Sequence, residues 1–250
     1  SGLLFYKKAN CLFVSNINGK AGDKDGNGSI AKLSLDGNII NANWVSGLNA
    51  PKGMGIYKNK LYVTDLNEVV VIDISKSAIV DRIVVDNAKF LNDLTISNEG
   101  TIFISDSRSG KVHSIENGVV STYIDSLKGP NGLLAVDGYL YVLDRGTLFQ
   151  YKNSQQIAKI ADGFDASTDG VEKIGLNEFI ISCWSGIIYY INEFGNKQVL
   201  LDKRNEKINS ADIGINLKQN MIYVPTFNSN KVVAYEFKKM RTMLNSRVSN

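Results

Sequence analysis

The sequence predicts an all-β protein with the fold of a six-bladed β-propeller made of four-stranded antiparallel blades. An apolar triplet, centred on an aromatic residue or an isoleucine, recurs about every 40 residues, and the six triplets begin at Leu12, Leu61, Ile102, Leu140, Phe179 and Ile222. Val, Ile, Tyr and Phe dominate the alternating segments around these triplets, which is typical of strands. Four strands in each repeat of about 40 residues indicate a propeller blade.

Each repeat is built in the same order. An alternating segment leads through a polar turn, such as Lys58-Asn59, into the triplet, and a third strand follows, such as KVVAYEF at 231–237. A fourth, more polar strand closes most repeats. We therefore expect one propeller domain over residues 1–237, with a basic tail over 238–250; the blades span about 1–50, 51–89, 90–129, 130–167, 168–209 and 210–237.

The last repeat has only three predicted strands. Its outer strand would come from residues upstream of Ser1 or from the tail, where TMLNSRV (242–248) is the candidate segment. The third alternative is a short blade that closes on side-chain packing alone. The sequence leaves all three open.

Composition excludes several classes of protein. The net charge of +3 arises in the tail, so the body of the chain is almost neutral and we expect no nucleic-acid partner. No apolar run is long enough for a membrane-spanning helix.

Two residue types limit the chemistry further. The single histidine, His113, lies in the strand-like stretch KVHSI, and the cysteines, Cys11 and Cys183, are far apart in the sequence. We interpret His113 as an ordinary strand residue and the cysteines as buried thiols. A metal ion in this protein would therefore be held mainly by oxygen.

Polar residues recur at the position where each inner strand should begin. Counting back ten or eleven residues from the triplet centres of blades 2 to 6 gives Lys52, Asn92, Asn131, Asp169 and Asp212. Inner strands of a propeller start near the central axis, so these side chains should converge there. Carboxylate and amide oxygens suit Ca²⁺ or Mg²⁺, with Asn131, Asp169 and Asp212 as candidate ligands. The alternative is that these residues only cap turns.

The strings PNGLL, TDGVE, LNDL and LNAPKGMGIY give the chain a family resemblance over residues 1–237. It resembles a bacterial branch, of poorly defined activity, of the gluconolactonase and regucalcin (senescence-marker protein) superfamily. The resemblance implies a divalent cation on the axis, held by Asn131 and Asp169, with Asn92 contacting substrate. Calcium is the first choice of ion, with magnesium, manganese and zinc as alternatives. The family's blade 1 glutamate falls near Ser1, and no carboxylate stands there.

Residues 21–33, AGDKDGNGSIAKL, have the spacing of a calcium loop at first sight. The twelfth loop position is Ser34 rather than Glu, and strands flank the segment instead of helices. We interpret it as a long, Gly-rich connection between the second and third strands of blade 1, with a free-standing calcium loop as the alternative.

Connections of this kind should surround the channel mouth. Arg108, Arg145 and Trp184 occupy similar connections, and we expect them to recognise a polar or sugar-like small molecule. Asn16, Asp65, Asp106 and Asp144 recur three residues beyond the triplet centres, and we expect them to act as caps.

These observations predict a metal-dependent hydrolase of the lactonase or ester type. Asp169, or Asp212, would take the proton, and Lys52 would stabilise the developing oxyanion. The alternative is a non-catalytic propeller that binds a small molecule or a protein, and another propeller chemistry such as a lyase also stays open. The resemblance and the start without Met favour a periplasmic or secreted protein.

Overall fold

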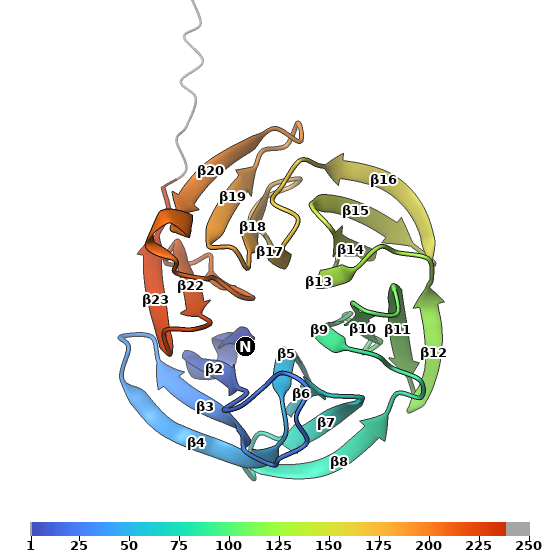
Figure 1. Cartoon of the computed structure of the whole chain (residues 1–250), viewed down its shortest axis with the longest axis vertical. Coiled ribbons are helices and arrows are strands. Elements are labelled where there is room, and N and C mark those ends of the chain that lie inside the picture. The colour runs from blue at the N-terminus through green and yellow to red at the C-terminus, as the bar shows by residue number, and fades with distance from the viewer. Residues whose placement is uncertain (1, 239–250) are drawn as a thin grey trace, which may run out of the picture.

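The computed structural model describes residues 2–238 as six antiparallel sheets around a central axis (Figure 1). Within each blade the strands follow the chain from the axis outward: β1 (Leu3–Tyr6), β2 (Cys11–Asn16), β3 (Gly28–Ser34), β4 (Ile39–Leu48); β5 (Pro51–Tyr57), β6 (Lys60–Asp65), β7 (Glu68–Asp73), β8 (Ala78–Val84); β9 (Leu91–Ile96), β10 (Ile102–Asp106), β11 (Lys111–Glu116), β12 (Val119–Ile124); β13 (Pro130–Val136), β14 (Tyr139–Asp144), β15 (Thr147–Lys152), β16 (Gln155–Ala161); β17 (Thr168–Lys173), β18 (Phe179–Cys183), β19 (Ile187–Ile191), β20 (Lys197–Asp202); β21 (Gly214–Asn216), β22 (Met221–Thr226), β23 (Lys231–Glu236). The predicted six-bladed fold is confirmed.

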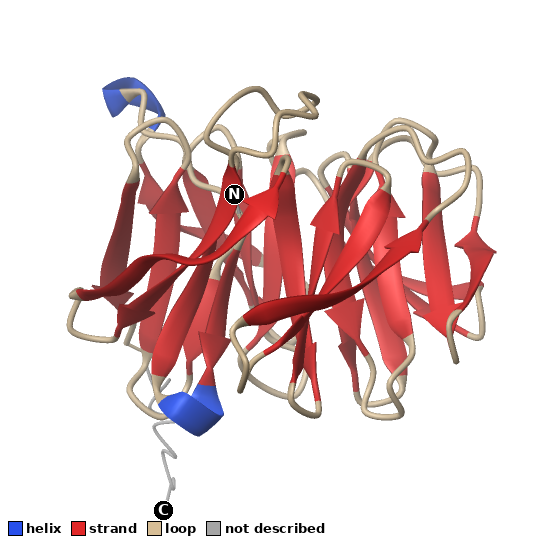
Figure 2. Cartoon of the chain, turned by 90° about the horizontal axis from the view of Figure 1, so that it is seen from below, coloured by secondary structure: helices blue, strands red, loops and turns tan. Residues whose placement is uncertain are grey.

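Helix is almost absent from the described residues. Two short 3₁₀ turns, η1 (Lys7–Ala9) and η2 (Arg204–Glu206), are the helical elements of residues 2–238. Neither has the length or the apolar content needed to cross a membrane. The strands run between two faces covered by loops (Figure 2).

The apolar triplets form the second strand of every blade, and their side chains fill the space between blades. Tyr141 of β14 packs against Phe179 of β18, with ring centroids 4.9 Å apart, in a cluster shared by blades 4 and 5. Phe13 likewise contributes to a cluster shared by blades 1 and 2. Burial of one such side chain stabilises the fold by about 1.5–3 kcal/mol, so the recurring triplet explains the recurring blade.

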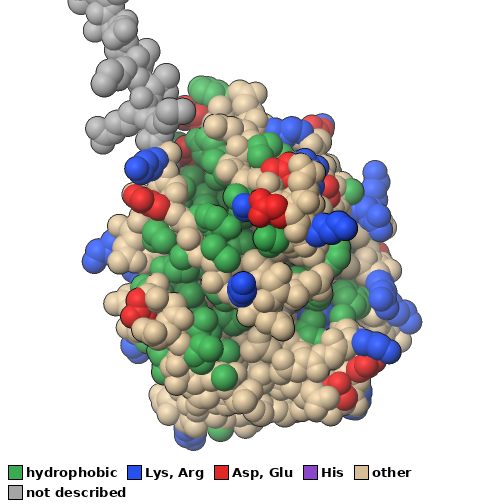
Figure 3. Space-filling view, turned by 60° about the vertical axis from the view of Figure 1, so that its left-hand side comes forward, with side chains coloured by type: hydrophobic (Ala, Val, Ile, Leu, Met, Phe, Trp, Pro, Cys, Tyr) green, Lys and Arg blue, Asp and Glu red, His purple; other side chains and the backbone are tan. Residues whose placement is uncertain are grey.

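Blade 6 has three strands within residues 2–238. Over the same residues, blades 1 and 6 share no strand pairing and pack through side chains, including Leu3, Val14 and Tyr223. The candidate fourth strand, 242–248, lies outside the described residues. Apolar side chains gather on the face near β20 and β23 (Figure 3), where Ile180, Leu201 and others line a hollow of about 560 Å³.

Three aspartates at the ends of second strands fix the start of the inner strand in their own blade. The carboxylate of Asp65 accepts hydrogen bonds from the backbone N–H groups of Asn49 and Ala50, at 2.8 and 2.6 Å. Asp106 and Asp144 bind the equivalent backbone pairs 89–90 and 128–129. The prediction of caps is confirmed for these three aspartates, and the capped segment is the one that leads into the inner strand. It is wrong for Asn16, whose side chain makes no such hydrogen bond among residues 2–238.

Side-chain donors also join neighbouring blades close to the axis. Each donates to a backbone carbonyl at the start of the next blade's inner strand, at 2.6–3.1 Å: Ser15 to Lys52, Thr64 to Asn92, Ser107 to Pro130, Asn131 to Thr168 and Ser182 to Ala211. These five bonds cover every interface from blade 1 to blade 6. They fix the relative positions of the inner-strand starts.

We expect Asp144→Ala to lower the free energy of unfolding by about 2–4 kcal/mol, because two backbone N–H groups lose their hydrogen bonds to a buried carboxylate. The matched control is Asp125→Ala, which removes an exposed carboxylate and should cost less than about 1 kcal/mol. Urea unfolding midpoints measure both. Equal losses in the two variants would contradict the capping role.

Candidate functional site

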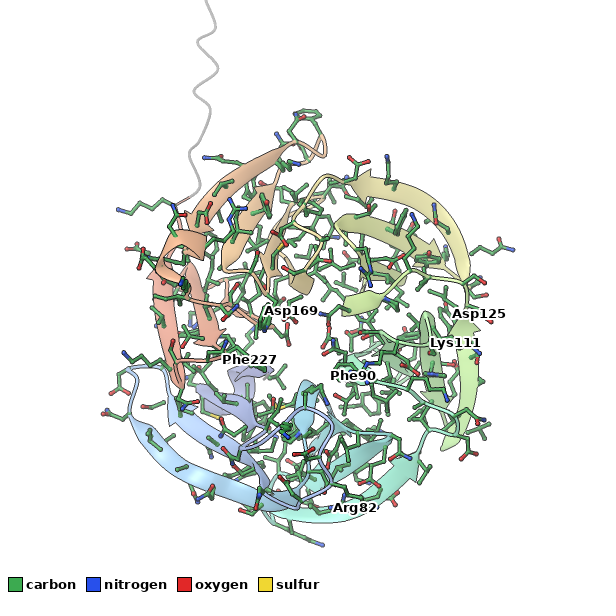
Figure 4. The ribbon with its side chains drawn as sticks, viewed as in Figure 1. Arg82, Phe90, Lys111, Asp125, Asp169 and Phe227 are labelled. Atoms are coloured by element: carbon green, nitrogen blue, oxygen red, sulfur yellow. The ribbon has the colours of Figure 1, made fainter. Side chains whose placement is uncertain are left out.

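A cavity of about 450 Å³ opens on the axis at the end where the inner strands begin. Its wall contains all eight side chains singled out in the sequence: Lys52, Asn92, Arg108, Asn131, Arg145, Asp169, Trp184 and Asp212. In Figure 4, Asp169, Phe90 and Phe227 lie around the central opening, whereas Arg82, Lys111 and Asp125 lie on the outer ring. The starts of the inner strands and the nearby loops therefore bring residues from five blades into one cavity.

Glycines allow the blades to approach so closely. A Cβ atom on Gly132, which follows Asn131, would lie 2.1 Å from the backbone oxygen of Asp169. A Cβ atom on Gly170 would lie 2.6 Å from Oδ1 of Asp212. Any larger residue would push away the next blade's inner strand at Asp169 or Asp212, so these glycines set the size of the ring.

Three carboxyl groups, Asp93, Asp169 and Asp212, line the cavity, and the charge of a fourth, Glu172, acts on Asp212. Burial raises the pKa of Asp93 to about 7, of Asp169 to about 6 and of Glu172 to about 8. The pKa of Asp212 is raised well above its usual range by burial and by the charges of the other three carboxyl groups. At Asp93 and Glu172 a neighbouring carboxyl charge adds to the larger effect of burial, so the protonation states of these groups are linked.

Asp93 and Glu172 were missed by the sequence reasoning. Asp93 is only 6% exposed, and its two oxygens accept hydrogen bonds from the backbone N–H groups of Leu94 and Leu133, both at 2.7 Å. It directly follows Asn92, at the position where blades 2, 4 and 5 have glycine. That replacement of glycine by a carboxylate was the signal available in the sequence.

The side-chain oxygen of Asn131 lacks a hydrogen-bond partner. Its amide nitrogen donates to the backbone oxygen of Thr168 at 3.1 Å, while its Oδ1 is buried and accepts no hydrogen bond. The Asn131 amide also favours the ionised form of Asp169, against the effect of burial on the pKa of that carboxyl. A buried acceptor left without a donor is costly in a folded protein, so Oδ1 is available to a ligand. By contrast, the Asn92 amide nitrogen donates to Ser107 Oγ at 3.2 Å.

The Gly-rich segment predicted as a connection is confirmed as the loop between β2 and β3. Its backbone is held by local bonds, such as Asn27 N–H to Asp25 Oδ1 at 3.0 Å. Ile17 and Ala21 from this loop line the cavity. The loop therefore forms part of the wall of the mouth.

His113 and the cysteines stand apart from the cavity. His113 is buried in β11, with Nε2 3.7 Å from Asp106 Oδ2, and burial lowers its pKa. Cys11 and Cys183 are buried free thiols, as predicted, and burial raises the pKa of each.

No single cluster of strong metal ligands stands out. Across residues 2–238, no three side chains of the His, Cys, Asp and Glu types come close enough together to hold one ion. A cation in this cavity would need the Asn131 oxygen, with one or two carboxylates and water completing its coordination. Such a ligand set is ordinary for Mg²⁺ and Ca²⁺.

Comparison with known proteins shows the fold and leaves the family open. No protein-family model and no curated protein matches the chain. A solved streptogramin B lyase has a TM-score of 0.66 at 13% identity, over 92% of this chain and 91% of that one. A catalytically inactive variant of virginiamycin B lyase from Staphylococcus aureus, solved with quinupristin, also has a TM-score of 0.66 at 13% identity, over 95% and 94%. The selenomethionine-substituted enzyme from the same organism has a TM-score of 0.64 at 17% identity, over 96% and 84%.

These neighbours support a propeller related in fold to the lyases, and they do not single out the gluconolactonase branch.

The raised pKa values predict that the protein loses stability as pH rises. The Glu172 carboxyl binds its proton more tightly in the folded state, where its pKa is about 8, than in the unfolded state, where it is about 4.5. The free energy of unfolding therefore falls as pH rises from about 4.5 to about 8. While Glu172 titrates, the slope is at most about 1.4 kcal/mol per pH unit. Glu172→Gln should therefore gain stability relative to wild type as pH rises.

Urea unfolding at pH 5, 6.5 and 8 measures this difference. The control is Glu116→Gln, at an exposed position on β11, and its stability should stay parallel to wild type across the series. A constant offset for Glu172→Gln would show that the carboxyl is ionised throughout.

Proposed function

We propose that the central cavity hydrolyses an ester or a lactone, with a divalent cation bound at its floor. The observation that carries the proposal is the unpartnered, buried Asn131 Oδ1 next to Asp169, among four carboxyl groups of raised pKa. Asn131 and Asp169, with Asp212 or Asp93, would hold the cation. When bound, it would polarise the ester carbonyl and lower the pKa of a water molecule.

The chain's own residues supply the remaining roles. When Asp212 completes the ligand set, Asp93, with a pKa raised to about 7, is suited to accept a proton near neutral pH. The carboxylate not engaged as a ligand would act as the base. The cavity walls hold the substrate and exclude part of the solvent.

The structural neighbours make a lyase reaction the second candidate. One of them was inactivated by replacing a histidine with alanine. The only histidine of this chain, His113, lies in β11 and does not line the cavity. An acid–base step in the cavity would therefore use its carboxyl groups or Lys52, which favours the hydrolase over a lyase that depends on histidine.

We expect Ca²⁺, Mn²⁺ or Mg²⁺ to raise the thermal midpoint of the protein. Saturation at 100 times the Kd adds about 2.7 kcal/mol, which is a shift of several degrees. Binding should release protons between pH 6 and 8, because the carboxyl groups must ionise. Asp169→Asn should abolish both effects, whereas Asp137→Asn, in the turn between β13 and β14, should leave them unchanged.

A panel of lactones and aryl esters then tests turnover. Hydrolysis that depends on the added cation and is lost in Asp169→Asn supports the proposal. Cation binding without turnover of any ester would favour the non-catalytic binding propeller, and no shift with any divalent ion would overturn the metal site.

A further inference from the structure

The mouth of the cavity is divided into two chemically different halves. Lys52, Arg108 and Arg145, from blades 2, 3 and 4, line one side. Trp184 and Phe227, from blades 5 and 6, line the other, with ring centroids 5.9 Å apart. Trp184 is 42% exposed. A ligand in the mouth therefore meets positive charge on one side and an aromatic surface on the other.

The three cations have no acidic partner. None of the ion pairs among residues 2–238 includes Lys52, Arg108 or Arg145. Lys52 Nζ lies 4.8 Å from the centroid of the Phe90 ring, and Arg108 Cζ lies 4.6 Å from the same centroid. Two like charges therefore share one aromatic ring, with no carboxylate bridging them.

Lys52 is the most confined of the three. It is only 5% exposed, and its ammonium group donates one hydrogen bond, to the backbone oxygen of Ala50 at 2.9 Å. Burial lowers its pKa to about 8, with Arg108 adding to the effect and Asp65 opposing it. An ammonium group has three donors, so two remain for a ligand.

Arg145 is held by its backbone and by a glycine. Its φ of +44° places it in the left-handed region, directly after β14. A Cβ atom on Gly129 would lie 3.0 Å from Arg145 Nε, so the absence of a side chain there leaves room for the guanidinium group. The local structure thus accommodates a free arginine at the rim.

We propose that the natural substrate is an amphipathic acid, whose carboxylate or phosphate group binds Lys52, Arg108 and Arg145. Its apolar part would lie against Trp184 and Phe227. This inference rests on the proposed function, since the reacting ester would then lie between the two halves, above Asn131 and Asp169. It assigns Lys52 to substrate binding, because the Lys52 ammonium group lies over the same Phe90 ring as the Arg108 guanidinium group.

Binding of simple amphipathic probes tests the proposal without turnover. Calorimetry in metal-free buffer compares hexanoate, hexyl phosphate and 1-hexanol, which share an apolar chain and differ in the head group. We expect at least one anion to bind at least tenfold more tightly than hexanol, and the better anion identifies the head group. The affinity of the anion should fall with added salt.

Arg108→Met combined with Arg145→Met should reduce anion affinity at least tenfold and leave hexanol binding unchanged. The control is Arg82→Met, on outer strand β8, where the arginine pairs with Glu68. Equal affinities for the anions and hexanol, or an unchanged affinity in the double variant, would overturn the proposal. Because the assay uses neither metal nor ester, its failure is distinct from failure of the hydrolase function.

Discussion

The contacts between neighbouring inner strands determine what this propeller can do. Five side-chain hydrogen bonds join consecutive blades at the starts of these strands, and glycines such as Gly132 and Gly170 let the backbones meet. Aspartates at the ends of second strands fix the segments that lead in. Polar side chains from five blades consequently reach one cavity. A wider ring would leave each carboxyl group solvated and independent of the others.

The burial of charged side chains close to one another determines the electrostatics of the cavity. Burial raises the pKa values of Asp93, Asp169, Glu172 and Asp212, while the three cations at the rim have no acidic partner among residues 2–238. The two sets of charge are kept apart instead of forming ion pairs with each other. A protein that needed only stability would gain by pairing or replacing them, since isolated buried charges are costly. We propose that this separation serves ligands, with a cation at the floor and an anion at the rim.

The repeat of about 40 residues made the fold predictable, and it also predicted which polar residues face the central channel. Because equivalent positions of a propeller converge, counting back from the triplets located Asn131, Asp169 and the other polar residues of the wall without any coordinates. Asp93 and Glu172 escaped this reasoning, because they lie one and three residues beyond the counted positions of their blades. The unpaired state of Lys52 was equally invisible, since ion pairing depends on side-chain directions that spacing does not specify. The outer strand of blade 6 stays open, because its candidate segment lies outside the described residues.

Anomalous diffraction from a crystal grown with Mn²⁺ tests the central claim most directly. The account predicts one strong peak on the axis, bonded to Asn131 Oδ1 and to a carboxylate oxygen of Asp169. Manganese found only at surface carboxylates, with Asn131 Oδ1 bonded to a protein donor, would contradict it.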